Sequence, residues 1–163
     1  MFTDIVGYSK MAGKDESHAL QLLDKHNKII TESIQKFNGS VVKFIGDAVF
    51  AQFEKPGEAS QCAVNIQKKF IKRNKIHSKN DRIHIRIGLH MGALVVKEDD
   101  LFGNTVNLGS RIESVAPIDG ILISSPIHDA IKDDSSFYAK EVGSVKLKNI
   151  KDPCQLHKLY LDR

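Results

Sequence analysis

Two aspartates, Asp4 and Asp47, each stand where an apolar run meets a turn. Asp4 lies in the run Phe2-Thr3-Asp4-Ile5, and Asp47 follows Gly46 between two β-rich runs. Carboxylate oxygens on rigid backbone are the ligands that Mg²⁺ and Mn²⁺ prefer, and two such ions can hold a triphosphate and an attacking hydroxyl. We therefore expect a two-metal site here, in preference to two aspartates that only cap turns.

A third stretch, residues 100–111, carries further polar groups that could do chemistry. Asn107 and Arg111 are four residues apart, so they lie on one face of a helix if this stretch is helical. An amide and a guanidinium on one helix face can bind a polar, negatively charged substrate.

Length and composition describe an ordinary globular chain. The 163 residues are 41% hydrophobic, which is enough for one domain with its own core, and we expect a single domain over 1–163. No apolar run approaches the about 20 residues that span a bilayer, and no signal peptide opens the chain. Cys62 and Cys154 lack metal-ligand spacing, which favours a reduced, cytoplasmic protein.

The charge of +4 is mild, but one segment is strongly basic. Two interpretations are open for it, a patch for nucleic acid or membrane and a solvated helix end whose cations favour the helix dipole, and we favour the second. We accordingly expect no nucleic-acid partner and no direct insertion into a membrane. The segment contains Lys68, Lys69, Lys72, Arg73, Lys75 and Lys79.

Hydrophobic periodicity predicts an α+β fold. Its order is that of a ferredoxin-like βαββαβ sheet, with helices packed on one face and a C-terminal β extension. The first strand would be a stub if the chain began at Met1, so we expect a piece of a longer protein with residues upstream. We predict helices at 16–37 (with Leu20, Leu23, Ile30, Ile34 and Phe37 inward), 57–75, 105–115 and 126–131, and strands at 1–5, 41–45, 48–53, 83–89, 93–96 and 121–123, with two or three more in 138–160.

Five motifs in this order resemble the catalytic domain of class III nucleotidyl cyclases, the family of adenylyl and guanylyl cyclases. The resemblance covers the chain from Phe2 to Tyr160. The motifs are Phe2-Thr3-Asp4-Ile5-Val6-Gly7-Tyr8-Ser9, Lys43-Phe44-Ile45-Gly46-Asp47, Arg86-Ile87-Gly88-Leu89-His90-Met91-Gly92, the stretch Asp100 to Arg111, and Leu147-Lys148-Asn149.

The resemblance implies a homodimer that binds ATP in sites shared between protomers. One protomer would supply Asp4, Asp47 and the Ile5 carbonyl to two divalent cations, Mg²⁺ or Mn²⁺. The same protomer would bind phosphates through Arg86 and through the backbone of Gly7, Tyr8 and Ser9.

The other protomer would supply the remaining contacts. Asn107 would orient the ribose, Arg111 would stabilise charge on the α-phosphate, and Lys148 would neutralise the terminal phosphates. Lys146 and Lys151 lie close to Lys148 in sequence, so any of the three could simply be solvated.

The base would be read by Lys43 and Asp100, a donor and an acceptor that fit adenine better than guanine. Asp99 adjoins Asp100, so the register could differ by one residue. Asn149 stands after Lys148 where the family has glycine, and asparagine tolerates the left-handed conformation that such a turn requires.

The expected function is therefore adenylyl cyclase activity, in which the ribose 3′-hydroxyl attacks the α-phosphate of ATP and expels pyrophosphate. Guanylyl cyclase activity or relaxed purine choice is the first alternative. A silent nucleotide-binding or interaction domain is the second, although Asp4, Asp47 and Arg111 are all present. An upstream regulatory domain is a further expectation.

Overall fold

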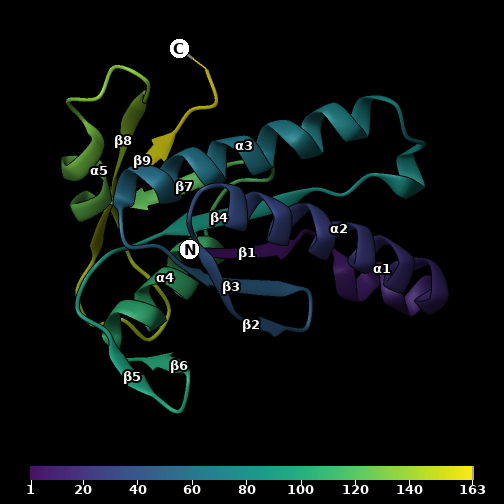
Figure 1. Ribbon diagram of the computed structural model, residues 1–163, viewed down its shortest axis with the longest axis horizontal. Coiled ribbons are helices and arrows are strands. Elements are labelled where there is room, and N and C mark those ends of the chain that lie inside the picture. The colour runs from purple at the N-terminus through teal and green to yellow at the C-terminus, as the bar shows by residue number, and fades with distance from the viewer. Residues whose placement is uncertain (163) are drawn as a thin grey trace.

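The computed structural model describes residues 1–162 as a twisted seven-stranded sheet, its helices and a small two-stranded ribbon (Figure 1). The elements, in chain order, are β1 Phe2–Ile5, α1 Tyr8–Lys14, α2 Glu16–Lys36, β2 Ser40–Ile45, β3 Ala48–Gln52, α3 Pro56–Lys75, a 3-10 turn Lys79–Asp81, β4 Ile85–Leu89, β5 Val95–Lys97, β6 Asp100–Phe102, α4 Asn104–Ser114, β7 Ile121–Ser124, α5 Ser125–Ile131, β8 Ala139–Val145 and β9 Cys154–Leu159.

The strand order is β2-β3-β1-β4-β7-β9-β8, and every pair is antiparallel except β4 with β7. Its first four strands give the predicted ferredoxin-like arrangement, and the strands after them form the C-terminal extension. The α+β class is confirmed. In this order β1 lies between β3 and β4, which places the candidate metal ligands of β1 beside both neighbours.

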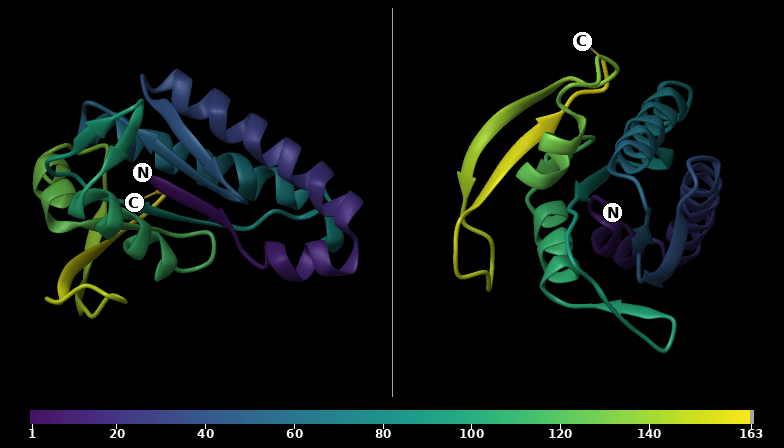
Figure 2. Two further views of the ribbon diagram at one scale, coloured as in Figure 1. Left: turned by 90° about the horizontal axis from the view of Figure 1, so that it is seen from below. Right: turned by 60° about the vertical axis from the view of Figure 1, so that its left-hand side comes forward.

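Helices α2, α3 and α5 cover one face of the sheet, as predicted, and α4 packs on the other. Along β7 the side chains alternate, so Ile121 and Ile123 join the main core with α2 and α3, whereas Leu122 packs with Ile112 of α4. The prediction of helices on one face is therefore corrected for α4. Figure 2 shows the sheet and its helices from two further directions.

Two glycines let α4 approach the sheet closely. A Cβ on Gly88 of β4 would lie 2.3 Å from the backbone nitrogen of Glu113, so no other residue fits there without displacing the helix. A Cβ on Gly109 would lie 3.2 Å from the ring of Phe2, which is tight contact. This close packing brings the C-terminal end of α4 against the strands that carry the candidate site.

Two elements were not predicted from the sequence. Helix α1 has no buried residue, so it lacks the apolar period that reveals a helix. Strand β6 is three residues long and pairs only with β5, and the ribbon that they form projects from the body of the molecule (Figure 1). The strand expected at 93–96 lies at Val95–Lys97 instead.

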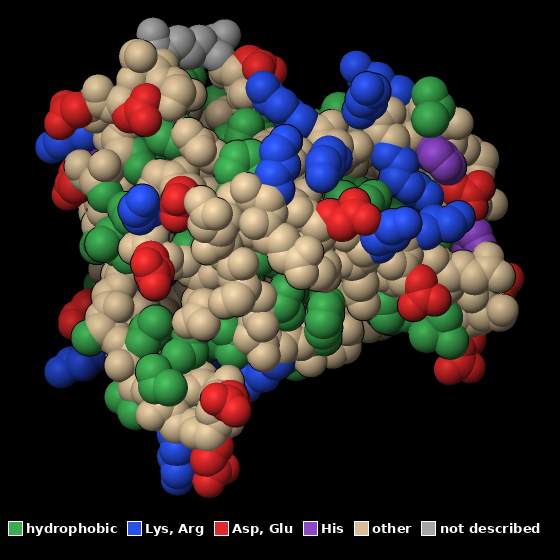
Figure 3. All heavy atoms as spheres, in the orientation of Figure 1, with side chains coloured by type: hydrophobic (Ala, Val, Ile, Leu, Met, Phe, Trp, Pro, Cys, Tyr) green, Lys and Arg blue, Asp and Glu red, His purple; other side chains and the backbone are tan. Residues whose placement is uncertain are grey.

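The basic segment forms the exposed end of α3, and three of its cations stand in the last turn, as the helix-dipole interpretation predicts. Figure 3 shows Lys and Arg side chains gathered over this part of α3 and the adjoining α2. Within residues 1–162, no helix has the length and apolarity needed to cross a membrane.

Candidate active site

The structure brings Asp4 and Asp47 together at the end of β1. The β2–β3 hairpin turns at Gly46, whose φ of 59° is a left-handed conformation that glycine adopts freely. This turn carries Asp47 back towards β1, where its Oδ2 accepts a hydrogen bond of 3.0 Å from the backbone N–H of Ile5. This hydrogen bond brings together two aspartates that are 43 residues apart in the sequence.

Asp47 is partly buried beside a second carboxylate, an environment that would suit a metal ligand. Burial and the nearby Asp4 carboxylate raise the pKa of Asp47, although its hydrogen bonds to backbone N–H groups lower it in part. A divalent cation between the two carboxylates would remove their repulsion. Two carboxylates and the Ile5 carbonyl suit a hard cation that takes its remaining ligands from phosphate and water. No group of three or more His, Cys, Asp or Glu side chains suited to a metal occurs within residues 1–162.

Arg86 lies directly across from Asp4 in the β1–β4 pair and binds it with two hydrogen bonds. Its Nη2 donates to Asp4 Oδ2 at 2.6 Å and its Nε to Oδ1 at 3.1 Å, and Nη1 donates to the carbonyl of Ser114 at 2.9 Å. The hydrogen-bonded Asp4 carboxylate raises the pKa of Arg86. Arg86, predicted to bind phosphate, is therefore a partner of a candidate metal ligand in the structure.

Glu113, at the end of α4, completes this charged centre and was missed by the sequence reasoning. Its side chain is 7% exposed, and its Oε1 lies 3.6 Å from Arg86 Nε, which is too long for a hydrogen bond. Burial first, and then the adjacent Asp4 carboxylate, raise the pKa of Glu113 to about 8. The sequence signal for Glu113 is Gly88, which stands between two apolar residues of β4. A glycine at such a position indicates that a helix packs closely on the strand there.

The two predicted base-reading residues lie against each other. Lys43 Nζ donates to Asp100 Oδ2 at 2.6 Å, and this contact together with the Leu101 N–H lowers the pKa of Asp100. Asp99 instead occupies the β5–β6 turn with φ of 61°, so the register places Asp100 in the pair. Phe102, which the sequence reasoning missed, places its exposed ring 5.8 Å from the Lys43 ammonium, and adds an aromatic face to the pair.

Asn107, Arg111 and Lys148 form no hydrogen bond or ion pair with the charged centre in the described part of the chain. Asn107 and Lys148 are exposed, and within residues 1–162 neither they nor Arg111 hydrogen bond to Asp4 or Asp47. Arg111 Nε is buried without a hydrogen-bond partner in this part of the chain. Asn149 does adopt the left-handed conformation anticipated for its turn, with φ of 59°.

The predicted phosphate turn is shorter than expected. Gly7, with φ of 73°, is the N-cap of α1, and Tyr8 and Ser9 already belong to the helix. The Tyr8 side chain packs against the main core, so Tyr8 could bind phosphate only through its backbone. The N–H of Val6 is held by the carbonyl of His84 at 2.8 Å, which fixes the turn to the start of β4.

Comparison with known proteins agrees with this geometry. The family of adenylate and guanylate cyclase catalytic domains matches residues 1–160. A solved adenylate/guanylate cyclase/hydrolase from Silicibacter pomeroyi superposes with a TM-score of 0.88 at 29% identity, covering 96% of this chain and 91% of that one. The adenylyl cyclase CyaB from P. aeruginosa shares the fold, with a TM-score of 0.80 at 22% identity, covering 99% and 92%.

Among curated relatives, a putative adenylate cyclase 3 from Rhizobium meliloti is 30% identical over 155 residues, which are 94% of this chain and 26% of the relative. An adenylate cyclase from Streptomyces coelicolor is 27% identical over 125 residues, which are 76% of this chain and 31% of the relative. The chain thus spans between a quarter and a third of these two proteins. Motifs, site geometry and family match agree, and the chain belongs to the adenylate and guanylate cyclase catalytic domain family.

Proposed function

We propose that this chain is an adenylyl cyclase domain that converts ATP to 3′,5′-cyclic AMP and pyrophosphate. The observation that carries the proposal is the hydrogen bond from Ile5 N–H to Asp47, which sets two candidate metal ligands side by side at the end of β1. The adenylate cyclases among the relatives support the same reaction.

On this proposal, Asp4, Asp47 and the Ile5 carbonyl hold two divalent cations. Cations held there would supply two things, acidification of the ribose 3′-hydroxyl and neutralisation of phosphate charge. Each Asp4 oxygen accepts one hydrogen bond from Arg86 and keeps a lone pair that could bind a cation, so Arg86 would hold Asp4 in place beside the metal. The backbone N–H groups from Gly7 to Ser9 bind phosphate oxygens at the same end of β1.

A second copy of the chain supplies the groups that this one leaves apart. Asn107 orients the ribose, while Arg111 and Lys148 stabilise the negative charge that builds up on the phosphates as the ring closes. Large apolar side chains that a partner could cover stand exposed on the β2–β3 hairpin and the β5–β6 ribbon, where Ile45 is 50% and Val96 71% exposed. A homodimer with two shared sites accounts for both observations.

Adenine is read by the Lys43–Asp100 pair. Lysine donates to N1 and aspartate accepts from the 6-amino group, whereas guanine presents the reverse pattern and would leave buried polar groups unpaired at a cost of about 1–3 kcal/mol. The 2.6 Å contact supports this assignment because it holds a donor and an acceptor next to each other. Guanylyl cyclase activity is the second candidate, since the family includes both activities.

The wider setting is also part of the proposal. Curated relatives several times longer than the matched region support a full-length protein in which a further domain regulates this one. We place the domain in the cytosol, where ATP is available.

The test is product formation by purified protein at high concentration with Mn²⁺, with ATP and GTP assayed in parallel. Cyclic AMP that disappears in Asp47→Ala supports the reaction and its metal site. Cyclic GMP alone would overturn the purine assignment. If a dimeric sample binds ATP and forms neither product, the domain is a silent nucleotide-binding member of the family.

A further inference from the structure

A hollow of about 430 Å³ lies outside the charged centre, between α1, the start of α2 and the segment that leads into β4. Its volume is within the range of about 300–1,000 Å³ typical of small-molecule sites. Gly7 is the only residue that it shares with the candidate active site. It is lined by Gly7, Lys10, Met11, Lys14, Asp15, His18, Lys79, Asn80 and Arg82.

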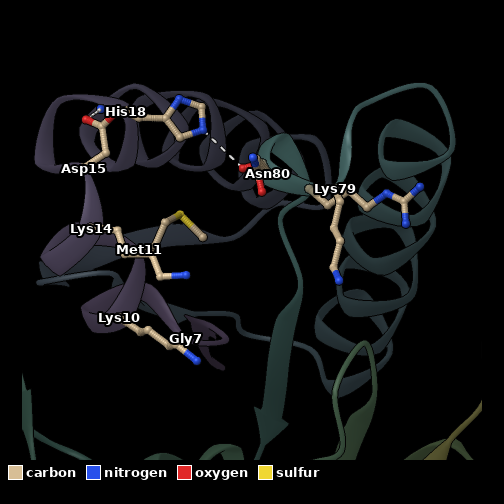
Figure 4. Close-up of a pocket in the computed structure, with 9 residues that line it drawn as sticks. Gly7, Lys10, Met11, Lys14, Asp15, His18, Lys79 and Asn80 are labelled. Carbon is tan, nitrogen blue, oxygen red and sulfur yellow. Dashed lines mark hydrogen bonds between the residues drawn. The ribbon is translucent and has the colours of Figure 1, made fainter.

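Cations dominate this hollow and come from two separate walls. Lys10 and Lys14 belong to α1, and Lys79 and Arg82 to the opposite segment. Figure 4 shows the side chains of Lys10 and Lys79 extending from these two walls. None of the four forms an ion pair with a carboxylate within residues 1–162.

The acidic groups at the hollow are already engaged. Asp15 caps α2 by accepting from the N–H of His18 at 3.0 Å. Asp81, just outside the lining, accepts from Ser78 at 2.6 Å and lies 3.3 Å from His18 Nε2. His18 in turn bonds to the Asn80 carbonyl at 3.1 Å, which ties the start of α2 to the segment that carries Lys79 and Arg82 and leaves the lysines without a carboxylate partner among the described residues.

Helix α1 gains most from an anion here. It is seven residues long, has no buried residue and no acid in its first turn, and carries two lysines one helical turn apart. Like charges at that spacing destabilise a helix. An anion bridging α1 and the opposite wall would offset this repulsion and fix a helix that begins at the candidate phosphate turn.

We propose that this hollow is a second binding site, for a soluble small molecule that carries two or more phosphate groups. A concave site with cations on facing walls suits a compact polyanion better than a flat or extended polymer. Binding there would order α1 and so influence the turn at Gly7, which gives the domain a place for control by a phosphorylated metabolite.

The experiment uses inorganic tripolyphosphate as probe, titrated calorimetrically into the purified chain with EDTA present to remove divalent cations. The double variant Lys79→Gln/Arg82→Gln should weaken binding about tenfold or more, because it removes one wall of charge. The matched variant Lys72→Gln/Lys75→Gln removes the same charge from the same basic segment outside the hollow and should change affinity less than twofold. Circular dichroism establishes that both variants are folded.

Equal weakening in the two double variants would show diffuse electrostatic attraction and overturn the proposal, as would the absence of binding. Weakening of binding to the same extent in a folded Arg86→Gln variant would place the anion in the active site and overturn it as well. Tighter binding of a poly-glutamate peptide than of tripolyphosphate would point to a protein partner instead. Because the readout is binding without metal, it is independent of whether the domain proves to be a cyclase.

Discussion

The charged centre at the end of β1 and the exposed face of α4 are built in opposite ways. Asp4, Asp47, Arg86 and Glu113 are at least half buried and in contact with one another or with backbone groups, on strands whose register is fixed. Asn107, in contrast, is exposed and makes no hydrogen bond to that centre within residues 1–162. Asn107 on the exposed face of α4 is therefore available to bind a group that this chain does not provide.

The two regions differ in the energetic cost of burying their polar groups. A buried carboxylate pair is costly unless a cation balances it, and here Arg86 is that cation. An exposed asparagine has no such cost, because water satisfies its hydrogen bonds until a substrate binds. One region is therefore assembled within a single chain, whereas on our proposal the other becomes a site only when a second copy faces it.

The largest effect is expected at the charged centre. Asp47→Ala should reduce cyclic AMP formation by about 10³-fold or more, because it removes a ligand on which metal binding depends. Turnover of saturating ATP with Mn²⁺ measures the loss. Asp133→Ala, which removes an exposed acid, is the matched control and should keep full activity. Comparable activity in the two variants would contradict the metal role of Asp47.

Base choice should respond next. Lys43→Glu removes the proposed donor to adenine and places a second carboxylate beside that of Asp100, so kcat/KM for ATP should fall about 10- to 100-fold, equal to about 1.4–2.7 kcal/mol. The ratio of ATP to GTP turnover is the diagnostic quantity. An unchanged ratio in a folded variant would separate the Lys43–Asp100 pair from base recognition. Lys28→Glu serves as the charge control on the exposed face of α2.

Lys148 should show a smaller effect that distinguishes it from its neighbours. Lys148→Ala should lower kcat/KM about tenfold, equal to about 1.4 kcal/mol, through loss of one phosphate contact. Lys146→Ala and Lys151→Ala, in the same loop between β8 and β9, should stay within twofold. If all three variants lose activity equally, the loop acts by its general charge and Lys148 has no specific role.

Glu113 should affect the pH dependence of stability. The pKa of Glu113 is raised to about 8, so between its unfolded value near 4.5 and about 8 the native state keeps a proton that the unfolded state has lost. Stability therefore falls as pH rises through that window, by up to about 1.4 kcal/mol per pH unit. In Glu113→Gln, melting in EDTA should depend less on pH. An identical pH profile for both proteins would mean that Glu113 titrates normally.

Sequence patterns predicted the larger elements because their periodicity is strong. The helix expected at 16–37 is α2, but the inward set was partly wrong, since Leu20 is 49% exposed and Leu22 is buried in its place. Helix α1 escaped prediction because it buries nothing. The opposite-face packing of α4 depends on Gly88, whose effect becomes visible only when a helix is placed against it.

The sequence predicted which residues form the candidate site, but it did not predict most of the contacts among them. The motifs identified Asp4 and Asp47 because each stands at a strand end, and strand register then closes the distance between them. The pairing of Arg86 with Asp4 and the burial of Glu113 follow from which strands and helix become neighbours. Such long-range pairing is set by packing across the whole sheet, which no local pattern encodes.

The central claim, that each site is completed by a second copy, is tested most directly by mixing two inactive variants. Asp47→Ala and Arg111→Ala homodimers should each be nearly silent. In a mixed dimer one site receives both substitutions and the other receives neither, so co-expressed variants should recover about one quarter of wild-type activity if copies pair at random. Recovery at that level supports the shared site. Two variants that stay silent in a verified mixed dimer would contradict it and place all the catalytic groups within one chain.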